Sequence, residues 1–228
     1  MATVLITGTN KGVGLEMTKI YAARGDKVLA CCRNPADAEA LNAVEGDVTV
    51  MEVVVGDDDS VKKLASQLDG VPIDVIINNA GMAGPGFTQQ TTYEMDFDGW
   101  AETFNVNSMG PVRVMQALMP NLRLAEAAKV MTVTSQMGAL SLDMVAAHAY
   151  CASKAAVNKF MRLAAIDLKK EGIAVGLVHP GWVQTDMGGP KADITPAESA
   201  KGCVEVTDGL NIDNTGGFWK WMGDTHDW

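Results

Sequence analysis

The stretch TVLITGTNKGVG at residues 3–14 decides the fold of this chain. It begins as a short apolar run with β-branched residues and continues with glycines at positions 8, 12 and 14, after which the apolar spacing becomes helical. Glycine permits a tight turn and a close approach of backbone to a ligand, and a following helix offers free N–H groups to an anion. Turns alone explain many glycine clusters, but a cluster between a first strand and a first helix predicts a dinucleotide-binding unit.

Similar apolar runs recur along the rest of the chain. They lie at 27–32, 48–55, 73–81, 129–135 and 173–181, with a weaker run at 216–222. Continuous apolar runs indicate strands that are covered on both faces, and the helical stretches between them indicate parallel crossovers. The sequence therefore predicts a doubly wound α/β Rossmann fold, with a mostly parallel sheet and helices on both faces. No repeat or linker divides it, so residues 1–228 are expected to form a single domain.

Composition and charge restrict the partners of this domain. The chain has 228 residues, of which 47% are hydrophobic, and its formal net charge of −10 argues against nucleic acid or an anionic membrane as a partner. The four cysteines include the adjacent pair Cys31 and Cys32 and show no metal-ligand spacing, so we expect reduced thiols and no metal site. The sequence shows no export signal and no long apolar segment, and a cytoplasmic location is expected.

The end of the second predicted strand distinguishes between two dinucleotides. In such folds an acid there binds the ribose 2′-hydroxyl of NAD, whereas an arginine accommodates the 2′-phosphate of NADP. The strand ends in ACCRNP, which supplies Arg33 and no acid, and Lys11 in the glycine loop offers a second cation. The pair favours NADP(H), and the alternative is that both are ordinary surface cations.

The stretch AYCASKAAV at 149–157 places Tyr150 and Lys154 four residues apart. On a helix they lie on the same face, where an ammonium group favours the phenolate and lowers the pKa of the phenol towards working pH. Such a pair can act as a general acid. Taken alone, a tyrosine and a lysine at this spacing are more often surface neighbours.

These motifs together resemble the short-chain dehydrogenase/reductase family over nearly the whole chain. The TGxxxGxG pattern of residues 7–14 is similar to the compact reductases of that family, whereas its sugar-nucleotide epimerases usually carry TGxxGxxG. NNAG at 78–81, NVNSMG at 105–110 and VTSQMG at 133–138 follow in the order of the family. Taken singly, Asn107 could cap or kink a helix and Ser135 could end a strand.

The resemblance implies a catalytic tetrad of Asn107, Ser135, Tyr150 and Lys154. Tyr150 would be the general acid for a carbonyl substrate, and Ser135 would hydrogen-bond the substrate oxygen. Lys154 would lower the phenol pKa and hold the nicotinamide ribose, and Asn107 would position a water that links Lys154 to solvent.

The resemblance also implies a set of residues along the cofactor. The expected contacts are Gly8, Asn10, Lys11, Gly12, Val13, Gly14, Arg33, Val55, Asn79, Ala80, Gly81, Tyr150, Lys154, Pro180, Gly181, Val183 and Thr185. The chain departs from the family at the end of the third strand, where Val54 occupies the position of an acid that often binds the adenine amino group. Asp57 or Asp58 could substitute, or the adenine could rest on Val55 alone.

The substrate is expected to lie under the segment at about 186–200, which follows the sixth strand. Apolar residues favour an apolar aldehyde or ketone over a sugar phosphate, although the same residues could be core packing. With Ser135, the expected substrate contacts are Met137, Leu140, Met144, Trp182 and Met187. The short chain and its last residues are similar to the small branch of carbonyl reductases that includes the sniffer and C-factor proteins.

Two other functions compete with an NADPH-dependent reductase. An NADP-binding redox regulator with vestigial activity would share the fold, but regulators of this kind commonly lose the tyrosine or lysine. A sugar-nucleotide epimerase usually needs more chain after residue 190. The helices predicted within 101–118 and 152–168 would permit a homodimer or homotetramer, whereas members of the small branch can also be monomers.

Overall fold

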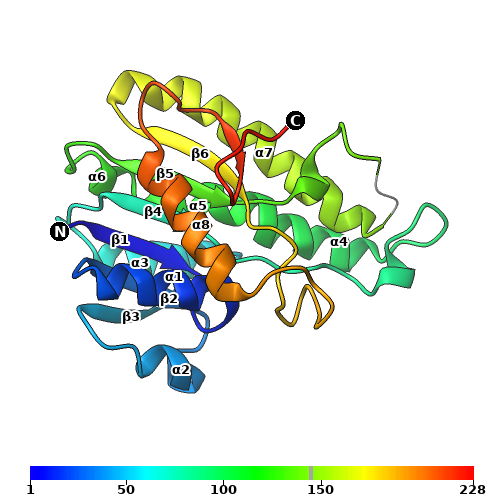
Figure 1. Cartoon of the computed structure of the whole chain (residues 1–228), viewed down its shortest axis with the longest axis horizontal. Coiled ribbons are helices and arrows are strands. Elements are labelled where there is room, and N and C mark those ends of the chain that lie inside the picture. The colour runs from blue at the N-terminus through cyan, green and yellow to red at the C-terminus, as the bar shows by residue number, and fades with distance from the viewer. Residues whose placement is uncertain (144–145) are drawn as a thin grey trace.

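The chain forms one α/β domain around a seven-stranded sheet (Figure 1). The computed structural model describes residues 1–143 and 146–228. The sheet order is β3-β2-β1-β4-β5-β6-β7, and every neighbouring pair is parallel. The strands are β1 (Thr3–Thr7), β2 (Lys27–Cys32), β3 (Val48–Glu52), β4 (Val75–Asn78), β5 (Lys129–Val133), β6 (Ala174–His179) and β7 (Phe218–Lys220). The predicted single-domain Rossmann fold is confirmed.

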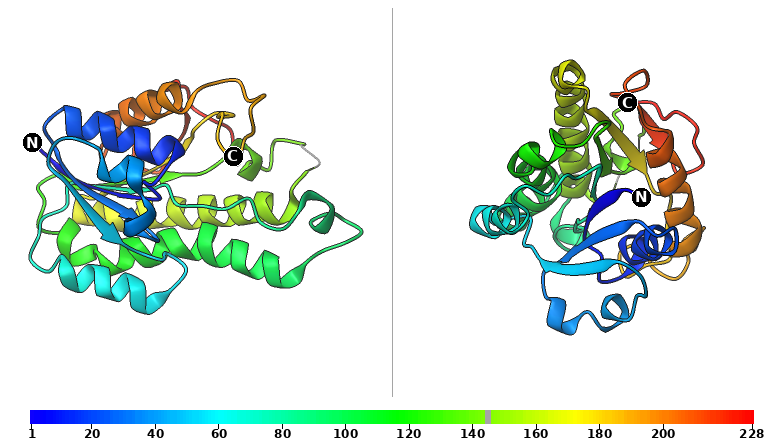
Figure 2. Two further views of the ribbon diagram at one scale, coloured as in Figure 1. Left: turned by 90° about the horizontal axis from the view of Figure 1, so that it is seen from below. Right: turned by 90° about the vertical axis from the view of Figure 1, so that its left-hand side faces the viewer.

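Helices cover both faces of the sheet, as the end-on view in Figure 2 shows. One face carries α1 and α8, which pack against each other, and the other carries α3, α5 and α7. The longer helices are α1 (Gly12–Ala23), α3 (Asp58–Gln67), α4 (Phe97–Phe104), α5 (Gly110–Ala117), α7 (His148–Leu168) and α8 (Pro196–Gly209). Two single-turn helices are α2 (Glu39–Asn42) and α6 (Met119–Leu122). Among the described residues, no helix is both long enough and apolar enough to cross a membrane.

The apolar core explains why the strands read as continuous hydrophobic runs. In β1, Leu5 faces the layer of α3, α5 and α7, whereas Val4 and Ile6 face the layer of α1 and α8, and all three are fully buried. Successive side chains of a strand point to opposite faces, so both sets of positions must be apolar. This burial fixes the sheet and leaves the loops at its carboxyl edge free to carry function.

Several element boundaries differ from the predicted ones. The runs at 48–55, 73–81 and 173–181 extend beyond β3, β4 and β6, because their last residues leave the hydrogen-bonded ladder and form loops at the carboxyl edge. The segment 186–200 is irregular only to Thr195, whose side chain and Glu198 form a capping box that starts α8.

The helical stretch between β4 and β5 also contains a feature that the sequence did not indicate. Residues Asn105–Met109 form a π-turn between α4 and α5. A π-turn is rare and is frequent at functional sites, because it widens the helix by one residue and redirects side chains. Here it contains Asn107.

Candidate active site

The glycine loop after β1 is packed against the loop after β4. Gly8 has φ +73°, and a Cβ there would lie 2.8 Å from Cα of Ala80. A Cβ on Gly14 would lie 2.2 Å from the carbonyl oxygen of Gly8. The Asn79 amide donates to the carbonyl oxygens of Thr7 and Gly8, at 3.0 Å each. Because β1 and β4 adjoin where the strand order reverses, this loop lies at the switch point where such sheets bind ligands.

At the same edge the segment after β6 meets the glycine loop, and α7 meets the loop after β4. A Cβ on Gly12 would lie 3.3 Å from Cγ2 of Thr185, and a Cβ on Gly81 would lie 3.7 Å from Nζ of Lys154. Gly181 has φ +88°, and a Cβ there would lie 2.6 Å from Ile194. Side chains at these positions would block close approach to the backbone. The residues present therefore fit a dinucleotide, because glycine at positions 8, 12 and 14 allows the tight, closely packed loop that such a ligand needs.

The structure brings three of the predicted catalytic residues together. Ser135 follows β5, Tyr150 lies in the first turn of α7, and Lys154 lies one turn later. Nζ of Lys154 is 5.7 Å from the centroid of the Tyr150 ring and donates to the carbonyl oxygen of Val133 at 3.1 Å. A Cβ on Gly138, in the turn after Ser135, would lie 2.7 Å from the backbone of Lys154, so this turn packs directly on α7.

Burial dominates the electrostatics of this pair. It raises the pKa of Tyr150 to about 12, and the Ser135 hydroxyl opposes the shift in part. Burial also lowers the pKa of Lys154 to about 8. The phenol pKa is therefore raised overall rather than lowered as predicted, because a poorly solvated site disfavours the phenolate, as it disfavours the ammonium of Lys154.

Asn107 joins the loop after β4 to α7. Its Oδ1 accepts the N–H of Met82 at 2.8 Å, and its Nδ2 donates to the Met82 carbonyl oxygen at 2.8 Å and to Oγ of Ser153 at 3.1 Å. Oγ of Ser153 in turn donates to the carbonyl oxygen of Tyr150 at 2.7 Å. Both N–H groups of the amide are occupied. A water held by Asn107 would therefore have to donate a hydrogen bond to a carbonyl oxygen of Asn107.

Known proteins resemble this chain in sequence and in fold. The model of a protein family described as short chain dehydrogenase matches residues 2–194 of this chain. The chain belongs to this family. C-signal of Myxococcus xanthus is 42% identical over 158 residues, which cover 69% of this chain and 93% of that protein. The 1-hydroxy-2-glutathionyl-2-methyl-3-butene dehydrogenase of Rhodococcus sp. is 33% identical over 227 residues, which cover 96% of each chain.

Solved structures of other short-chain dehydrogenases are similar over the whole chain. NADPH-bound carbonyl reductase from chicken fatty liver has a TM-score of 0.91 and 28% identity, covering 100% of this chain and 99% of that one. The carbonyl reductase Sniffer of D. melanogaster has a TM-score of 0.90 and 25% identity, covering 100% of both chains. The predicted resemblance to the small carbonyl reductase, sniffer and C-factor-like branch is confirmed.

The two predicted cations lie at the carboxyl edge of this short-chain dehydrogenase. Arg33 is exposed in the turn after β2. Lys11 pairs with Asp186 across a distance of 2.5 Å between Nζ and Oδ2, and both side chains are largely exposed. Asp186 belongs to the segment after β6, so the pair links that segment to the glycine loop. The sequence pattern gave no sign of Asp186 because the partners are 175 residues apart.

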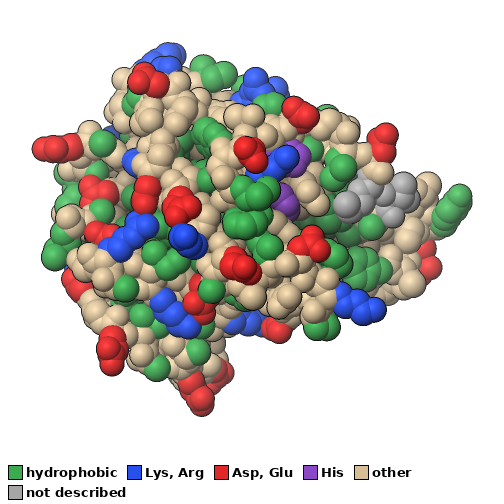
Figure 3. All heavy atoms as spheres, in the orientation of Figure 1, with side chains coloured by type: hydrophobic (Ala, Val, Ile, Leu, Met, Phe, Trp, Pro, Cys, Tyr) green, Lys and Arg blue, Asp and Glu red, His purple; other side chains and the backbone are tan. Residues whose placement is uncertain are grey.

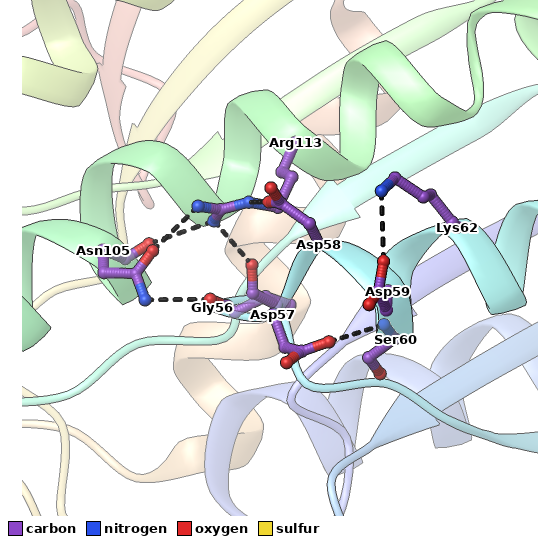
Figure 4. Close-up of polar contacts among 9 residues, drawn as sticks. Gly56, Asp57, Asp58, Asp59, Ser60, Lys62, Asn105 and Arg113 are labelled. Atoms are coloured by element: carbon purple, nitrogen blue, oxygen red, sulfur yellow. Dashed lines mark hydrogen bonds and ion pairs between the residues drawn. The ribbon is translucent and has the colours of Figure 1, made fainter.

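Figure 4 shows the contacts of Asp57 and Asp58, the two acids that were alternatives for binding the adenine. Asp57 caps α3 by accepting the N–H of Ser60 at 2.7 Å. Asp58 pairs with Arg113 of α5, whose guanidinium also donates to the carbonyl oxygen of Val55 at 3.0 Å. The Asp57 carboxylate is thus used in capping α3, and the Asp58 carboxylate is used in joining α3 to α5. Val55 itself is 8% exposed and packs near Gly110 in the core.

Three of the expected substrate residues, Leu140, Trp182 and Met187, are at the surface rather than in the core. Leu140 is 88% exposed, Trp182 is 49% exposed and Met187 is 50% exposed. The Trp182 indole donates to the carbonyl oxygen of Gly188 at 2.9 Å, which fixes its ring over the segment after β6. Met137 is partly buried beside Ser135, whose hydroxyl accepts its N–H at 3.1 Å. Met144 lies outside the described residues.

Proposed function

We propose that this short-chain dehydrogenase is an NADPH-dependent oxidoreductase that interconverts an aldehyde or ketone and an alcohol. The observation that carries the proposal is the grouping of Ser135, Tyr150 and Lys154 at the carboxyl edge of the sheet, where Lys154 lies next to Gly81 in the loop after β4. NADP(H) as the cofactor is supported by carbonyl reductases of similar structure that hold it, such as the NADP complex from Pseudomonas aeruginosa PAO1 at 30% identity.

The protein side of the reduction follows from these three residues. Bound NADPH supplies the hydride that reaches the carbonyl carbon. Tyr150 donates the proton to the carbonyl oxygen, and a phenol with a pKa of about 12 keeps that proton at neutral pH. The Ser135 hydroxyl donates to the same oxygen and stabilises the charge that develops there. Lys154, which is mostly charged below its pKa of about 8, stabilises the phenolate left behind.

A redox-sensing regulator is not favoured by these findings. Its distinguishing feature would be the loss of Tyr150 or Lys154, and both are present and adjacent. The structurally similar carbonyl reductases also favour an enzyme.

The proposed partners are small carbonyl and alcohol molecules, under the segment at 186–195. Acidic and basic side chains are interspersed over the face shown in Figure 3. All four cysteines are free thiols, which supports the proposed cytoplasmic location.

Self-association through α5 and α7 is part of the proposal. Met109, the residue before α5, and Phe160 of α7 are exposed and line a groove of about 440 Å³. Leu163 of α7 is 49% exposed one turn further on. A second copy of the chain could cover this apolar surface, which favours a homodimer or homotetramer.

The test of the function is NADPH oxidation by the purified protein with a panel of aldehydes, ketones and quinones. We expect turnover with apolar carbonyls and a clear preference for NADPH over NADH. NADPH that binds tightly without any turnover on the panel would count against the proposed reaction. A preference for NADH would count against the roles of Arg33 and Lys11 alone.

Asp186→Asn should tighten NADPH binding by about two- to fivefold, because it frees Lys11 for the 2′-phosphate and an exposed ion pair contributes little on its own. Fluorescence titration measures the dissociation constant, and the gain should shrink in high salt. NADH should bind as before. Asp193→Asn removes an exposed carboxylate from the same segment and serves as the control. An equal gain for NADH, or in the control, would contradict the competition between Asp186 and the phosphate.

A further inference from the structure

The helix that carries Tyr150 begins without a local cap. Ala147 occupies the N-cap position of α7 with φ 48° and ψ 53°, a left-handed conformation that is uncommon for a residue other than glycine, and it provides no side-chain hydrogen bond. The first N–H groups of a helix have no acceptor within the helix. An N-cap side chain usually accepts from the second or third of them. In α7 the third N–H belongs to Tyr150.

Gln90 supplies the missing acceptors from the loop between β4 and α4. Its carbonyl oxygen accepts the N–H of His148 at 3.3 Å, and its side-chain Oε1 accepts the N–H of Tyr150 at 3.3 Å. The side chain is 1% exposed, so water does not compete for these bonds. At the right-hand end of Figure 1, this loop reaches the start of α7. A residue 60 positions earlier thus takes the role of the cap.

The orientation of the Gln90 amide is fixed by the hydrogen bonds of its nitrogen atom. Nε2 donates to the carbonyl oxygens of Ala83, at 3.2 Å, and of Pro85. A flipped amide would place its N–H groups against the N–H of Tyr150 and its oxygen against two carbonyls. Only one orientation satisfies all the partners. The same loop begins at Met82, which Asn107 holds through both of its backbone groups.

We propose that Gln90 is a positioning residue that sets the place of Tyr150 by capping α7 from outside the helix. The consequence for catalysis rests on the proposed function, in which Tyr150 donates the proton. Without the Gln90 oxygen, the N–H of Tyr150 lies buried without a partner, and the first turn of α7 loosens or shifts. Displacement of a proton donor by about 1 Å lowers turnover by as much as about 10²-fold without changing its chemistry.

Gln90→Met is the variant that removes the acceptor while keeping the length and shape of the side chain. We expect kcat to fall by about tenfold while the KM for NADPH stays within about twofold, because the glycine loop is untouched. Amide hydrogen exchange, followed residue by residue by NMR, should be at least about tenfold faster at Tyr150. Gln89→Met changes the exposed neighbouring glutamine and should leave both measurements unchanged.

Gln90→Glu is the conservative variant that keeps Oε1. Burial keeps its carboxyl group protonated, and the hydroxyl can donate to one of the two carbonyls in the loop. It should therefore retain the protection of the Tyr150 amide and most of kcat. A Gln90→Met protein with wild-type protection at Tyr150, or a Gln90→Glu protein as slow as Gln90→Met, would overturn the proposal. The exchange measurement does not depend on the reaction, so failure of the cap can be distinguished from failure of the proposed function, which the Tyr150→Phe variant tests.

Discussion

Tyr150→Phe should lower turnover with any carbonyl substrate by roughly 10²–10⁴-fold, the contribution expected of a general acid. The substitution keeps the ring that packs beside Lys154 and removes only the hydroxyl. Because burial holds the phenol in its protonated form, with a pKa of about 12, the wild-type residue is ready to donate at neutral pH and the variant has nothing to donate. The loss should appear in kcat, measured at saturating NADPH, with the dissociation constant of NADPH nearly unchanged.

The control for this variant is another buried tyrosine. Tyr21 in α1 is 2% exposed, and its hydroxyl has no hydrogen-bond partner among the described residues. Tyr21→Phe therefore makes the same chemical change in the opposite helical layer and should leave kcat unchanged. Turnover near that of the wild type in Tyr150→Phe would rule out Tyr150 as the proton donor. Ser135 would then be the remaining hydroxyl at the site.

The fold could be predicted from the sequence because the apolar runs that specify each strand are local in the sequence. Strands buried on both faces must be apolar at every position, and their runs stand out between helical segments. The predicted run ended too late for β3 and began too early for β4, since Val53 and Ile73 are buried outside the ladder and look like strand residues in the sequence. An apolar residue in the sequence indicates burial, but it does not indicate whether the backbone of that residue is hydrogen-bonded in the sheet.

The candidate active site was only partly predictable, because its properties depend on residues that are far apart in the sequence. The positions of Ser135, Tyr150 and Lys154 relative to the strands and helices follow from a family pattern. Their electrostatics do not, because the burial that raises the pKa of Tyr150 and lowers that of Lys154 depends on the whole domain. The pairing of Lys11 with Asp186 and the contact of Gln90 with Tyr150 join distant segments through ordinary polar residues. A single sequence carries no signal for either.

Gly14→Ala should weaken NADPH binding by on the order of 10²-fold, because the added methyl group displaces the loop that holds the phosphates. Its Cβ would lie 2.2 Å from the carbonyl oxygen of Gly8 and 2.5 Å from Nδ2 of Asn79. Both distances are far below van der Waals contact, and the first neighbour is backbone, which cannot move aside alone. The Asn79 amide would also lose its hydrogen bonds to the carbonyl oxygens of Thr7 and Gly8. Fluorescence titration with NADPH measures the effect without relying on any substrate.

Gly209→Ala is the matched control, since a Cβ at this last residue of α8 would meet no atom within 4 Å. It adds the same methyl group to a helical glycine and should leave NADPH binding unchanged. Thermal unfolding of both variants separates a local displacement from a loss of the fold, because Leu5 and Ile6, which anchor β1 in the core, are untouched. NADPH affinity at the wild-type level in Gly14→Ala would mean that the phosphates lie elsewhere, and the assignment of the glycine loop would fail with it.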